Sequence, residues 1–549
     1  MTTFIFKKVL VSESYGWHKI EKDHLILWFK GYLYNSNEQS VLSQAVHLLN
    51  TNTFNINVLS KWSKSLSGHF AFILIADDAI FAAVDKVNTI PLFYSSNKDD
   101  FFIANKASLI KDRVSGNHQK INNQASLEIA MSGYTIGSKT LYQDLFQLTA
   151  GECLFFEKSS LNRIFYYTYS PWKVKDRSER ELIKDFNVIL NATMSELVDS
   201  IKGRQVVIPL SAGNDSRLIA SGLKHFGIDN VLCFSYGRKG NFESKMASLI
   251  SHKLGYKWKH IDINDSSKKK FFKSIKYKAY IDNYDSYSSI PAVQDIAEMC
   301  YIKEKNLVSD DAIIINGNTG DYISGGHLPQ ATLLNTNKDD IWKQFLLKHY
   351  VLWGKLNTHT NHSLIVKQLV KMLESRKITG FLNNNDFPFI FEVVEYLGRQ
   401  SMYVVNQQEA YDFNNYDWRL PLWSNSFLSF WESVPFEYKV GQRLYSKVLY
   451  ENNWGGVWQD IPINEKTIHP NWIRPLRFVS KVCLSPLGKD YWHSFEKNVF
   501  QYWMDLTRNS VITPYHKVLL DNNGQKNTFS WLSKMYLEEK DTNLNEFIN

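Results

Sequence analysis

Short apolar runs separated by polar clusters fill the first part of the chain. Such runs, rich in β-branched and aromatic residues and bounded by turn-forming residues, are typical of strands. The strongest cover residues 25–33, 70–75, 79–84 and 101–104, with one more at 151–156. The pattern predicts a β-rich first part, residues 1–165, in which 151–156 is the last strand. A connector over residues 166–180 is expected to follow it.

The pattern changes to alternating helix and strand beyond the connector. Apolar residues recur at helical spacing from Leu182 to Leu190, which predicts a helix that begins near Glu179. This rhythm of helix and strand is typical of a doubly wound parallel sheet that binds ligands at the carboxyl ends of its strands. From about residue 338 the pattern is mainly helical, and we treat 181–549 as one domain. The expected strands are 206–210, 231–236, 260–263 and 313–317, with helices at 217–226 and 243–254.

Bulk composition serves mainly to exclude several classes of protein. The 549 residues are 44% hydrophobic and 21% charged, which are globular values. The formal net charge of +8 fits a protein that handles phosphates and does not require a nucleic-acid partner. Four cysteines, Cys153, Cys233, Cys300 and Cys483, form no C-x-x-C pair, so neither a zinc site nor a disulfide framework is indicated. Because we find no leader and no membrane span in the sequence, we expect a cytoplasmic protein.

The most informative segment follows the expected strand 206–210. There the chain reads Ser211-Ala212-Gly213-Asn214-Asp215-Ser216 and then continues as a helix. A tight turn into a helix N-terminus directs backbone N–H groups at an anion, and the helix dipole favours negative charge there. A carboxylate such as Asp215 would repel bare phosphate, so its presence indicates a Mg²⁺ bridge. The turn lacks the endings of P-loop and dinucleotide-binding motifs, and an ordinary helix cap is the alternative interpretation.

Several segments, in the same order along the chain, resemble one known family. They are Leu66–Phe72, Val84–Tyr94 and Thr140–Gly151 in the first part, and the 211–216 turn in the second. These segments are similar to those of the asparagine synthetase B family, and the resemblance covers most of the chain. It implies an α+β first domain, an N-terminal-nucleophile (Ntn) β-sandwich flanked by helices. It also implies an α/β ATP pyrophosphatase domain of the HUP type with a helical C-terminal part. β-Lactam synthetases and lasso-peptide cyclases are similar as well.

The first part departs from this family where the glutaminase chemistry resides. A glutaminase of the family uses a Cys directly after the initiator Met, whose thiolate attacks the amide of glutamine. This chain has Thr2 and Thr3 there, and Val84 and Asn88 replace an Arg and a Gly of the family pattern. Threonine is an N-terminal nucleophile in other hydrolases, so Thr2 stays open as an alternative. Because the positioning groups have changed together with the nucleophile, we expect an inactive domain.

The second part keeps the residues that the family uses for ATP. The resemblance also implies that Asp321 is a second Mg²⁺ carboxylate, paired with Asp215. Two carboxylates at adjacent strand ends can hold Mg²⁺ against the phosphates of ATP. A loop turn beside Gly320 is the alternative role of Asp321. The residues assigned to nucleotide binding are Leu210, Ser211, Ala212, Gly213, Asn214, Asp215, Ser216, Phe234, Ser235, Asn316 and Gly317.

Residues for the amide-forming step are less well preserved. Asn318 stands where the family has a Glu or a Tyr that manages the proton of the incoming amine, and an amide is no base at neutral pH. Glu395 is a candidate replacement, with an ordinary surface Glu on a helix as the alternative. The resemblance gives Lys466, with Lys447 as second choice, the role of the Lys that stabilises the adenylate. Ser424 replaces an Asp of the family pattern.

Together these patterns predict a carbon–nitrogen ligase with ATP and Mg²⁺ as cofactors. A substrate carboxylate would become an adenylate with release of pyrophosphate, and a nitrogen nucleophile would then displace AMP. Without the glutaminase Cys, the nitrogen would come from free ammonia, from a partner amidotransferase or from an amine on the substrate.

The sequence leaves the partners and two other functions open. A small carboxylate, a peptide or a sugar acid would suit as substrate, and the sequence allows a homodimer. Asparagine synthesis from ammonia and a non-catalytic ATP-binding scaffold are the alternatives. Thiolation of tRNA commonly uses paired cysteines or an added basic RNA module, and the sequence contains neither.

Overall fold

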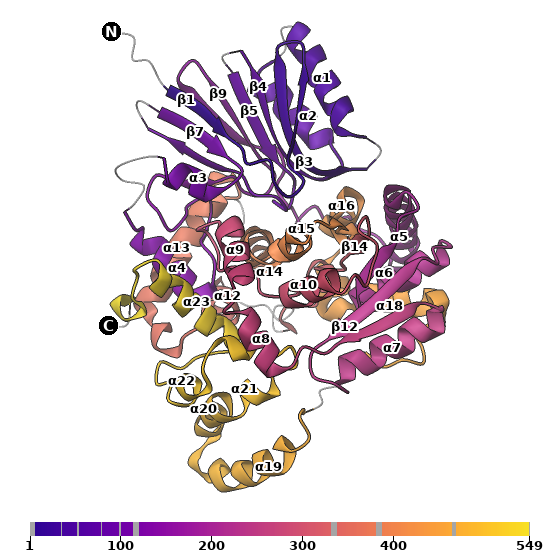
Figure 1. Ribbon diagram of the computed structural model, residues 1–549, viewed down its shortest axis with the longest axis vertical. Coiled ribbons are helices and arrows are strands. Elements are labelled where there is room, and N and C mark those ends of the chain that lie inside the picture. The colour runs from indigo at the N-terminus through magenta and orange to yellow at the C-terminus, as the bar shows by residue number, and fades with distance from the viewer. Residues whose placement is uncertain are drawn as a thin grey trace.

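The computed structural model describes residues 6–34, 36–51, 54–77, 79–97, 100–113, 120–330, 338–379, 387–463 and 468–547. Two β-sheets of the N-terminal part lie at one end of the molecule, and a parallel sheet with many helices forms the rest (Figure 1). The expected mixed architecture, with an α+β part followed by an α/β part, is therefore confirmed.

The N-terminal part is a sandwich of two sheets. Phe101 and Phe156, from opposite sheets, stack with ring centroids 4.1 Å apart and an interplanar angle of 4°. Helices α1 (Glu38–Asn50) and α2 (Ile56–Ser65) cover the other face of the larger sheet, where a second hydrophobic cluster lies. One sheet has the order β1 (Phe6–Leu10), β7 (Asp100–Ala104), β6 (Phe93–Ser96), β8 (Phe146–Gln147). The other has the order β10 (Ser160–Phe165), β9 (Glu152–Glu157), β5 (Ala79–Val84), β4 (Gly68–Ala76), β3 (Leu25–Leu33), β2 (His18–Lys22).

The sequence interpretation missed strand β10. We predicted that 151–156 was the last strand of this part, but β10 returns antiparallel to β9 directly after it, so that prediction is wrong. The turn consists of Lys158 and Ser159, both with positive φ, 48° and 69°. Two-residue hairpins need this conformation, which Gly and Asn usually supply. The Lys-Ser pair carries no such signal, and β10 is a partly exposed edge strand without a clear apolar alternation.

The second part contains a five-stranded, wholly parallel sheet. Helix α7 (Phe242–Leu254) packs against β12 and β13, and β11 and β14 are buried, as expected for a sheet covered on both faces. The sheet order reverses between β11 and β14, which makes their carboxyl ends the expected ligand crevice. The order is β13 (Lys257–Ile261), β12 (Val231–Tyr236), β11 (Val206–Pro209), β14 (Ile313–Ile315), β15 (Asp417–Arg419).

Most predicted elements of this part are confirmed with shifted bounds. Helix α5 (Glu179–Ile201) begins at the predicted residue, where Ser178 and Glu181 form a capping box. Helix α6 (Asn214–His225) begins three residues before the predicted bound, and β13 begins three residues before the predicted strand. Strand β15 was not predicted, because three residues are too few for a periodic signal.

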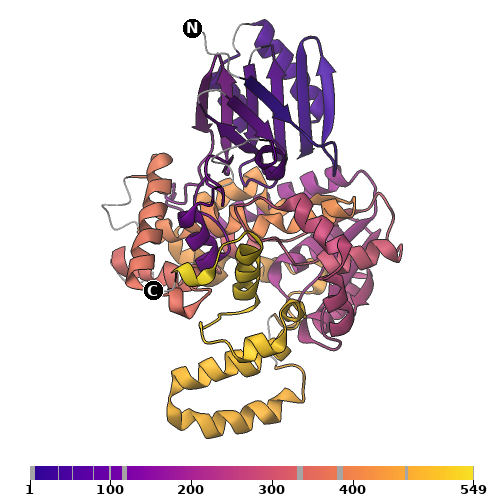
Figure 2. The same cartoon turned by 60° about the vertical axis from the view of Figure 1, so that its left-hand side comes forward.

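Helices dominate after residue 338, as predicted. Helices α19 and α20 form a hairpin that projects from the body (Figure 2). A small separate core, built on Ile473, Trp492 and Phe500, holds this hairpin. Within the described residues, no helix combines the length and the apolar character needed to cross a bilayer. The larger helices are α12 (Lys338–His349), α13 (His359–Ser375), α14 (Phe387–Glu395), α16 (Asn425–Glu432), α18 (Arg443–Asn452), α19 (Ile473–Leu484), α20 (Lys489–Val499) and α23 (Thr528–Glu539).

Further helices lie elsewhere in the described chain. They are α3 (Ala107–Lys111), α4 (Asn123–Ser132), α8 (Asp265–Phe271), α9 (Ile275–Tyr284), α10 (Ile296–Glu304), α11 (Gly320–Ile323), α15 (Glu409–Phe413), α17 (Phe436–Lys439), α21 (Gln501–Met504) and α22 (Tyr515–Leu519). Lys268 in α8 is buried and pairs with Glu298 at 2.7 Å.

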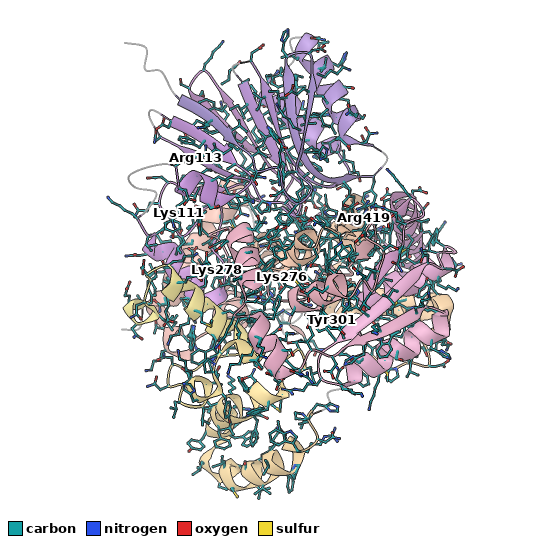
Figure 3. All side chains as sticks on the ribbon, viewed as in Figure 1. Lys111, Arg113, Lys276, Lys278, Tyr301 and Arg419 are labelled. Carbon is teal, nitrogen blue, oxygen red and sulfur yellow. The ribbon has the colours of Figure 1, made fainter. Side chains whose placement is uncertain are left out.

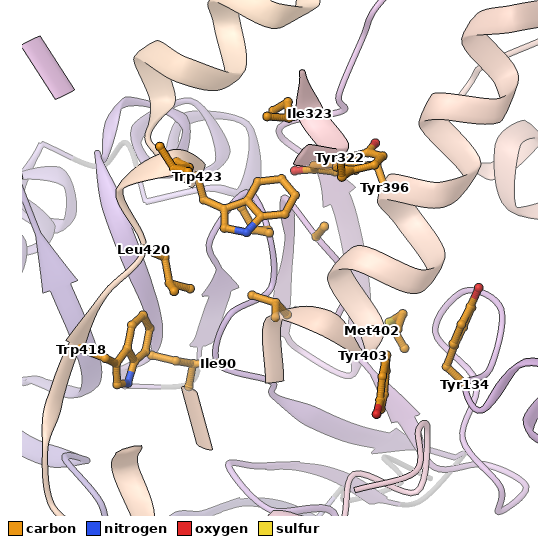
Figure 4. Close-up of a cluster of buried hydrophobic side chains, with 14 of the residues drawn as sticks. Ile90, Tyr134, Tyr322, Ile323, Tyr396, Met402, Tyr403, Trp418, Leu420 and Trp423 are labelled. Atoms are coloured by element: carbon orange, nitrogen blue, oxygen red, sulfur yellow. The ribbon is translucent and has the colours of Figure 1, made fainter. Parts of the chain in front are cut away.

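The two parts share one hydrophobic core. Ile90 from the N-terminal part belongs to the same cluster as Trp418 and Leu420 from the second part (Figure 4). Arg419, labelled in Figure 3, lies with its guanidinium 4.1 Å from the ring centroid of Tyr32 in β3. Arg419 also donates to the carbonyl of Trp418 and to Ser200 Oγ, so this residue joins the sheets rather than the ligand crevice.

A buried histidine at this junction predicts a specific acid sensitivity. His69 is 1% exposed, and its Nε2 lies 3.2 Å from the carbonyl oxygen of Leu420. Burial lowers the pKa of His69 from 6.5 to about 3. The folded protein therefore binds fewer protons at this site than the unfolded chain between these values, and stability is lost as pH falls below 6.5.

For His69→Gln, which keeps an N–H donor for Leu420, we expect a smaller loss of stability in acid. One group with this shift costs about 2 kcal/mol between pH 7 and pH 5. Urea unfolding of wild type and variant at the two pH values measures this difference. An equal loss in both proteins would show that His69 does not titrate on unfolding.

Candidate active site

A cavity of about 840 Å³ opens at the carboxyl ends of β11, β12 and β14. This is the edge of the sheet at which the strand order reverses. Most nucleotide-binding candidates line it: Leu210, Ser211, Gly213, Asn214, Asp215, Ser216, Phe234, Ser235, Asn316 and Gly317. The structure thus brings together three strand ends that the sequence placed far apart.

The 211–216 turn holds its shape through its own hydroxyl groups. The backbone N–H of Ser211 donates to Ser216 Oγ at 3.0 Å, and the N–H of Gly213 donates to Ser211 Oγ at 3.1 Å. Gly213 caps helix α6 without a side-chain hydrogen bond, so the first N–H groups of the helix have no side-chain cap. Such groups, together with the helix dipole, favour an anion at this point.

Ala212 and Arg217 support the turn from behind. Ala212 is fully buried and does not line the cavity, in contrast to the other residues of the turn. The buried guanidinium of Arg217 donates to the carbonyl of Ala212 at 2.7 Å and to the carbonyls of Val457, Ile461 and Pro462. The sequence interpretation missed this role, because contacts between residues so far apart leave no local pattern.

Asp215 and Asp321 meet across the crevice. The backbone N–H of Asp321 donates to Asp215 Oδ2 at 2.7 Å, and the Tyr445 hydroxyl donates to Asp215 Oδ1 at 3.0 Å. Burial, with Asp321 nearby, raises the pKa of Asp215 well above its usual range. Burial also acts to raise the pKa of Asp321, but the hydrogen bond with His327 brings it below its usual range. Two carboxylates so close together gain from a shared cation.

The surroundings of this pair fit a magnesium ion held partly by a nucleotide. A Cβ on Gly320 would lie 2.5 Å from Asp215 Oδ1, so only glycine leaves room for the carboxylate. Within the described parts of the chain no group of three or more His, Cys, Asp or Glu residues could hold a metal ion. Magnesium is commonly held by one or two carboxylates together with phosphate oxygens, and the Asp215–Asp321 pair matches that donor set.

Glu395 is not the surface residue that was the alternative interpretation. It ends helix α14, is fully buried and does not line the cavity. His327 joins it to the cavity, since Nδ1 contacts Glu395 and Nε2 lies 3.2 Å from Asp321 Oδ2. His349 Nε2 lies 3.1 Å from the second oxygen of Glu395. The surface interpretation is therefore wrong, and Glu395 reaches the cavity through His327.

Charge balance explains this arrangement. Burial alone would raise the pKa of Glu395, but His349 and His327 bring it well below its usual range. Burial would lower the pKa of His327, whereas its hydrogen bonds with Asp321 and Glu395 raise that pKa to about 9. At neutral pH His327 is therefore a cation held between two carboxylates. No local pattern in the sequence indicates this arrangement, because residues 327, 349 and 395 meet only in the folded chain.

Asn318 lines the cavity in a fixed orientation. Its side-chain Nδ2 donates to Gln407 Oε1 at 2.6 Å, and its backbone N–H donates to Asn316 Oδ1 at 2.9 Å. The side chains of Asn318 and of its partner Gln407 are both neutral amides, and neither is a base at neutral pH.

Comparison with known protein families finds a match for the N-terminal part of the chain. Residues 19–167 match the model of a glutamine amidotransferase domain. The match begins after the segment in which the family nucleophile would stand. No curated protein matches the chain.

Several solved structures are similar to parts of the chain. An NH₃-dependent NAD synthetase from Campylobacter jejuni is 15% identical over 43% of this chain and 96% of its own, with a TM-score of 0.22. A glutamine phosphoribosylpyrophosphate amidotransferase from B. subtilis is 10% identical over 55% of this chain and 63% of its own, with a TM-score of 0.18. An allosteric regulatory enzyme of purine biosynthesis is 13% identical over 43% of this chain and 60% of its own, with a TM-score of 0.18.

The structure describes only one of the two lysine candidates. Lys466 lies outside the described residues, as do Thr2 and Thr3. Lys447, the second choice, lies on α18 and pairs with Glu179 at 3.3 Å, outside the lining of the cavity. Arg217 binds the carbonyls of Ile461 and Pro462, so the segment that leads to Lys466 is tied to the 211–216 turn.

Proposed function

We propose that this protein is an ATP-dependent ligase that adenylates a substrate carboxylate, releases pyrophosphate and forms an amide bond. The observation that carries this proposal is the pair Asp215 and Asp321 at the switch point of a parallel sheet, beside a helix N-terminus, in one cavity. Residues 19–167 match a glutamine amidotransferase domain, and this match supports a function in amide chemistry.

In this proposal the chain's own groups bind and orient the nucleotide. Backbone N–H groups at the start of α6 and the hydroxyls of Ser211 and Ser216 bind phosphate oxygens. Asp215 and Asp321 would hold Mg²⁺, which would neutralise the charge of the departing pyrophosphate. Phe234 and Ser235, at the end of β12, flank the nucleoside. His327 adds a fixed positive charge beside Asp321, and Glu395 positions it.

Two alternative functions would use the same cavity. Asparagine synthesis from ammonia would place a smaller carboxylate substrate there. A non-catalytic scaffold would bind Mg·ATP there without activating a carboxylate. The nitrogen donor, the substrate and a homodimer stay predictions.

Exchange of radiolabelled pyrophosphate into ATP tests the ligase directly. The purified protein would be scanned over a panel of small carboxylates, sugar acids and peptides, each with and without Mg²⁺. We expect exchange that needs both Mg²⁺ and one class of carboxylate. Absence of exchange with every carboxylate, in a protein that Mg·ATP still stabilises, would favour the ATP-binding scaffold.

The first domain is expected to be inactive toward glutamine. Thr2 lacks a thiolate, and Val84 and Asn88 replace groups of the family pattern. Asn88 itself adopts a left-handed conformation, φ 62°, that the family glycine would supply. Incubation of the protein with glutamine should release no glutamate above a buffer control. Sustained release that disappears in Thr2→Ala would contradict this expectation.

A further inference from the structure

Arg399 lies in the wall of the cavity on an unusual turn of helix. Residues Tyr396–Gln400, which directly follow α14, form one π-helical turn. Such turns are rare, and they shift the side chains that follow relative to an ordinary α-helix. Arg399, Gln400 and Tyr403 line the cavity from this segment. The half-buried guanidinium of Arg399 thus belongs to the same cavity as the Asp215–Asp321 pair.

The charges in the lining single out this arginine. Five carboxylates line the cavity: Asp215, Glu243, Asp295, Asp321 and Asp505. Among the described lining residues, Arg399 alone carries a permanent positive charge, since His327 is the other basic residue. His327 is engaged by Asp321 and Glu395. The described chain offers Arg399 no carboxylate within 4.0 Å and no hydrogen bond to its side chain.

Positive charge accumulates around Arg399 instead of being neutralised. Burial, and then the nearby Arg399, lower the pKa of Lys526. Lys526 Nζ donates to the carbonyl of Lys348, whose own Nζ donates to the carbonyl of His327. Glu395, 3.7 Å from Lys348 Nζ, is shared with two histidines. A guanidinium in such surroundings gains from an external anion, which it can bind with two parallel hydrogen bonds.

We propose that Arg399 binds an anionic group of the substrate other than the carboxylate that is adenylated. This inference rests on the proposed ligase function. The reacting carboxylate loses its charge when the adenylate forms, so a permanent cation on it would stabilise the ground state and oppose the reaction. A second anionic group keeps its charge throughout, and holding it fixes the position of the reacting one.

The aromatic side of the cavity beside Arg399 indicates which kind of substrate portion lies between the two anionic groups. Tyr403 and Phe529 line the cavity beside Arg399, with ring centroids 5.7 Å apart and an interplanar angle of 87°. Aromatic faces favour an apolar or ring-shaped portion of a ligand. The substrate class is therefore an acid with at least two anionic groups, a carboxylate that reacts and a second carboxylate or a phosphate that Arg399 holds.

Calorimetry with defined probes tests this assignment without turnover. The protein would be saturated with Mg²⁺ and α,β-methylene-ATP, which cannot release pyrophosphate. Glutarate and 4-phosphonobutyrate are the dianionic probes, and the half-amide of glutarate is the matched monoanion. We expect wild type to bind a dianion about 10–100-fold more tightly than the half-amide, the value of a hydrogen-bonded charge pair. The stronger of the two dianions identifies the carboxylate or the phosphate as the natural group.

Variants at Arg399 separate this role from nucleotide binding. In Arg399→Gln the preference for dianions should disappear, and in Arg399→Lys part of it should return. Affinity for Mg·α,β-methylene-ATP should stay unchanged in both. Arg180→Gln, an exposed residue of α5, is the matched control and should behave as wild type.

Three results would overturn the assignment. A loss of nucleotide affinity in Arg399→Gln would place Arg399 on the triphosphate. Equal affinity of wild type for dianion and half-amide, or no binding of any probe, would remove the anion site. Failure of the ligase proposal gives a different result, namely retained preference for dianions with no pyrophosphate exchange for any carboxylate.

Discussion

Replacing Asp321 with Asn is expected to abolish pyrophosphate release while the fold stays intact. The Asp321 carboxylate faces the cavity beside Asp215, and the amide of Asn is a much weaker ligand for Mg²⁺. Without charge compensation at the leaving pyrophosphate, the activation free energy should rise by several kcal/mol. The rate should then fall about a thousand-fold. Asp215→Asn should have the same effect for the same reason.

The free protein should tolerate Asp215→Asn. Burial and the neighbouring Asp321 raise the pKa of Asp215, so removing its charge should leave the unfolding midpoint near that of wild type. Asp321→Asn removes a counter-charge of His327 and should lower the midpoint slightly, while the protein stays folded. Mg²⁺ should add to the thermal stabilisation by ATP in wild type but not in the variants. Asp310→Asn, an exposed carboxylate 90% accessible on the surface, is the control and should change nothing. Full pyrophosphate release in Asp215→Asn or Asp321→Asn would remove the metal assignment.

Replacing Glu395 with Gln is expected to weaken both the site and the fold. Glu395 is fully buried, compensates the charges of His327 and Lys348, and lies 3.1 Å from His349 Nε2. Breaking such a buried pair costs roughly 3–5 kcal/mol, because the partners stay behind without their counter-charge. His327 would also lose the contact that orients it toward Asp321, and partners of this kind are worth about 10–100-fold in metal affinity or activity.

A shift in the requirement for Mg²⁺ distinguishes positioning from simple instability. In Glu395→Gln the concentration of Mg²⁺ that gives half-maximal pyrophosphate exchange should rise, measured well below the unfolding temperature. Glu374→Gln, on the exposed face of α13, is the matched control and should leave this concentration unchanged. An unchanged Mg²⁺ requirement in Glu395→Gln, with reduced stability alone, would limit Glu395 to a structural role.

Local patterns predicted the strand, the turn and the helix that line one part of the cavity. The strand 206–209, the small-residue turn and helix α6 follow one another within a few residues, so periodicity and turn chemistry suffice to find them. Asp321 was assigned from the family resemblance, and it lies in a glycine-rich turn after β14. Parallel strands then bring these two turns together without further information.

The roles of His327, Glu395 and Arg399 could not be predicted from such patterns. His327 is far from the other two residues in the sequence, and all three roles depend on packing in three dimensions. An arginine or glutamate on a predicted helix is ordinarily solvated, so the sequence favoured the surface for Glu395. The hairpin turn at Lys158 and Ser159 was missed for a related reason, since neither residue is typical of the positive φ that the fold imposes.

Transfer of ¹⁸O from the substrate carboxylate to AMP is the sharpest test of adenylation. A carboxylate that supports pyrophosphate exchange would be labelled with ¹⁸O in both oxygens and converted with Mg·ATP and a nitrogen donor. Adenylation places one carboxylate oxygen on the phosphorus of AMP when the amide forms. An adenylating ligase should yield AMP that carries one ¹⁸O atom and pyrophosphate that carries none. Unlabelled AMP, or ADP and labelled phosphate as products, would contradict it.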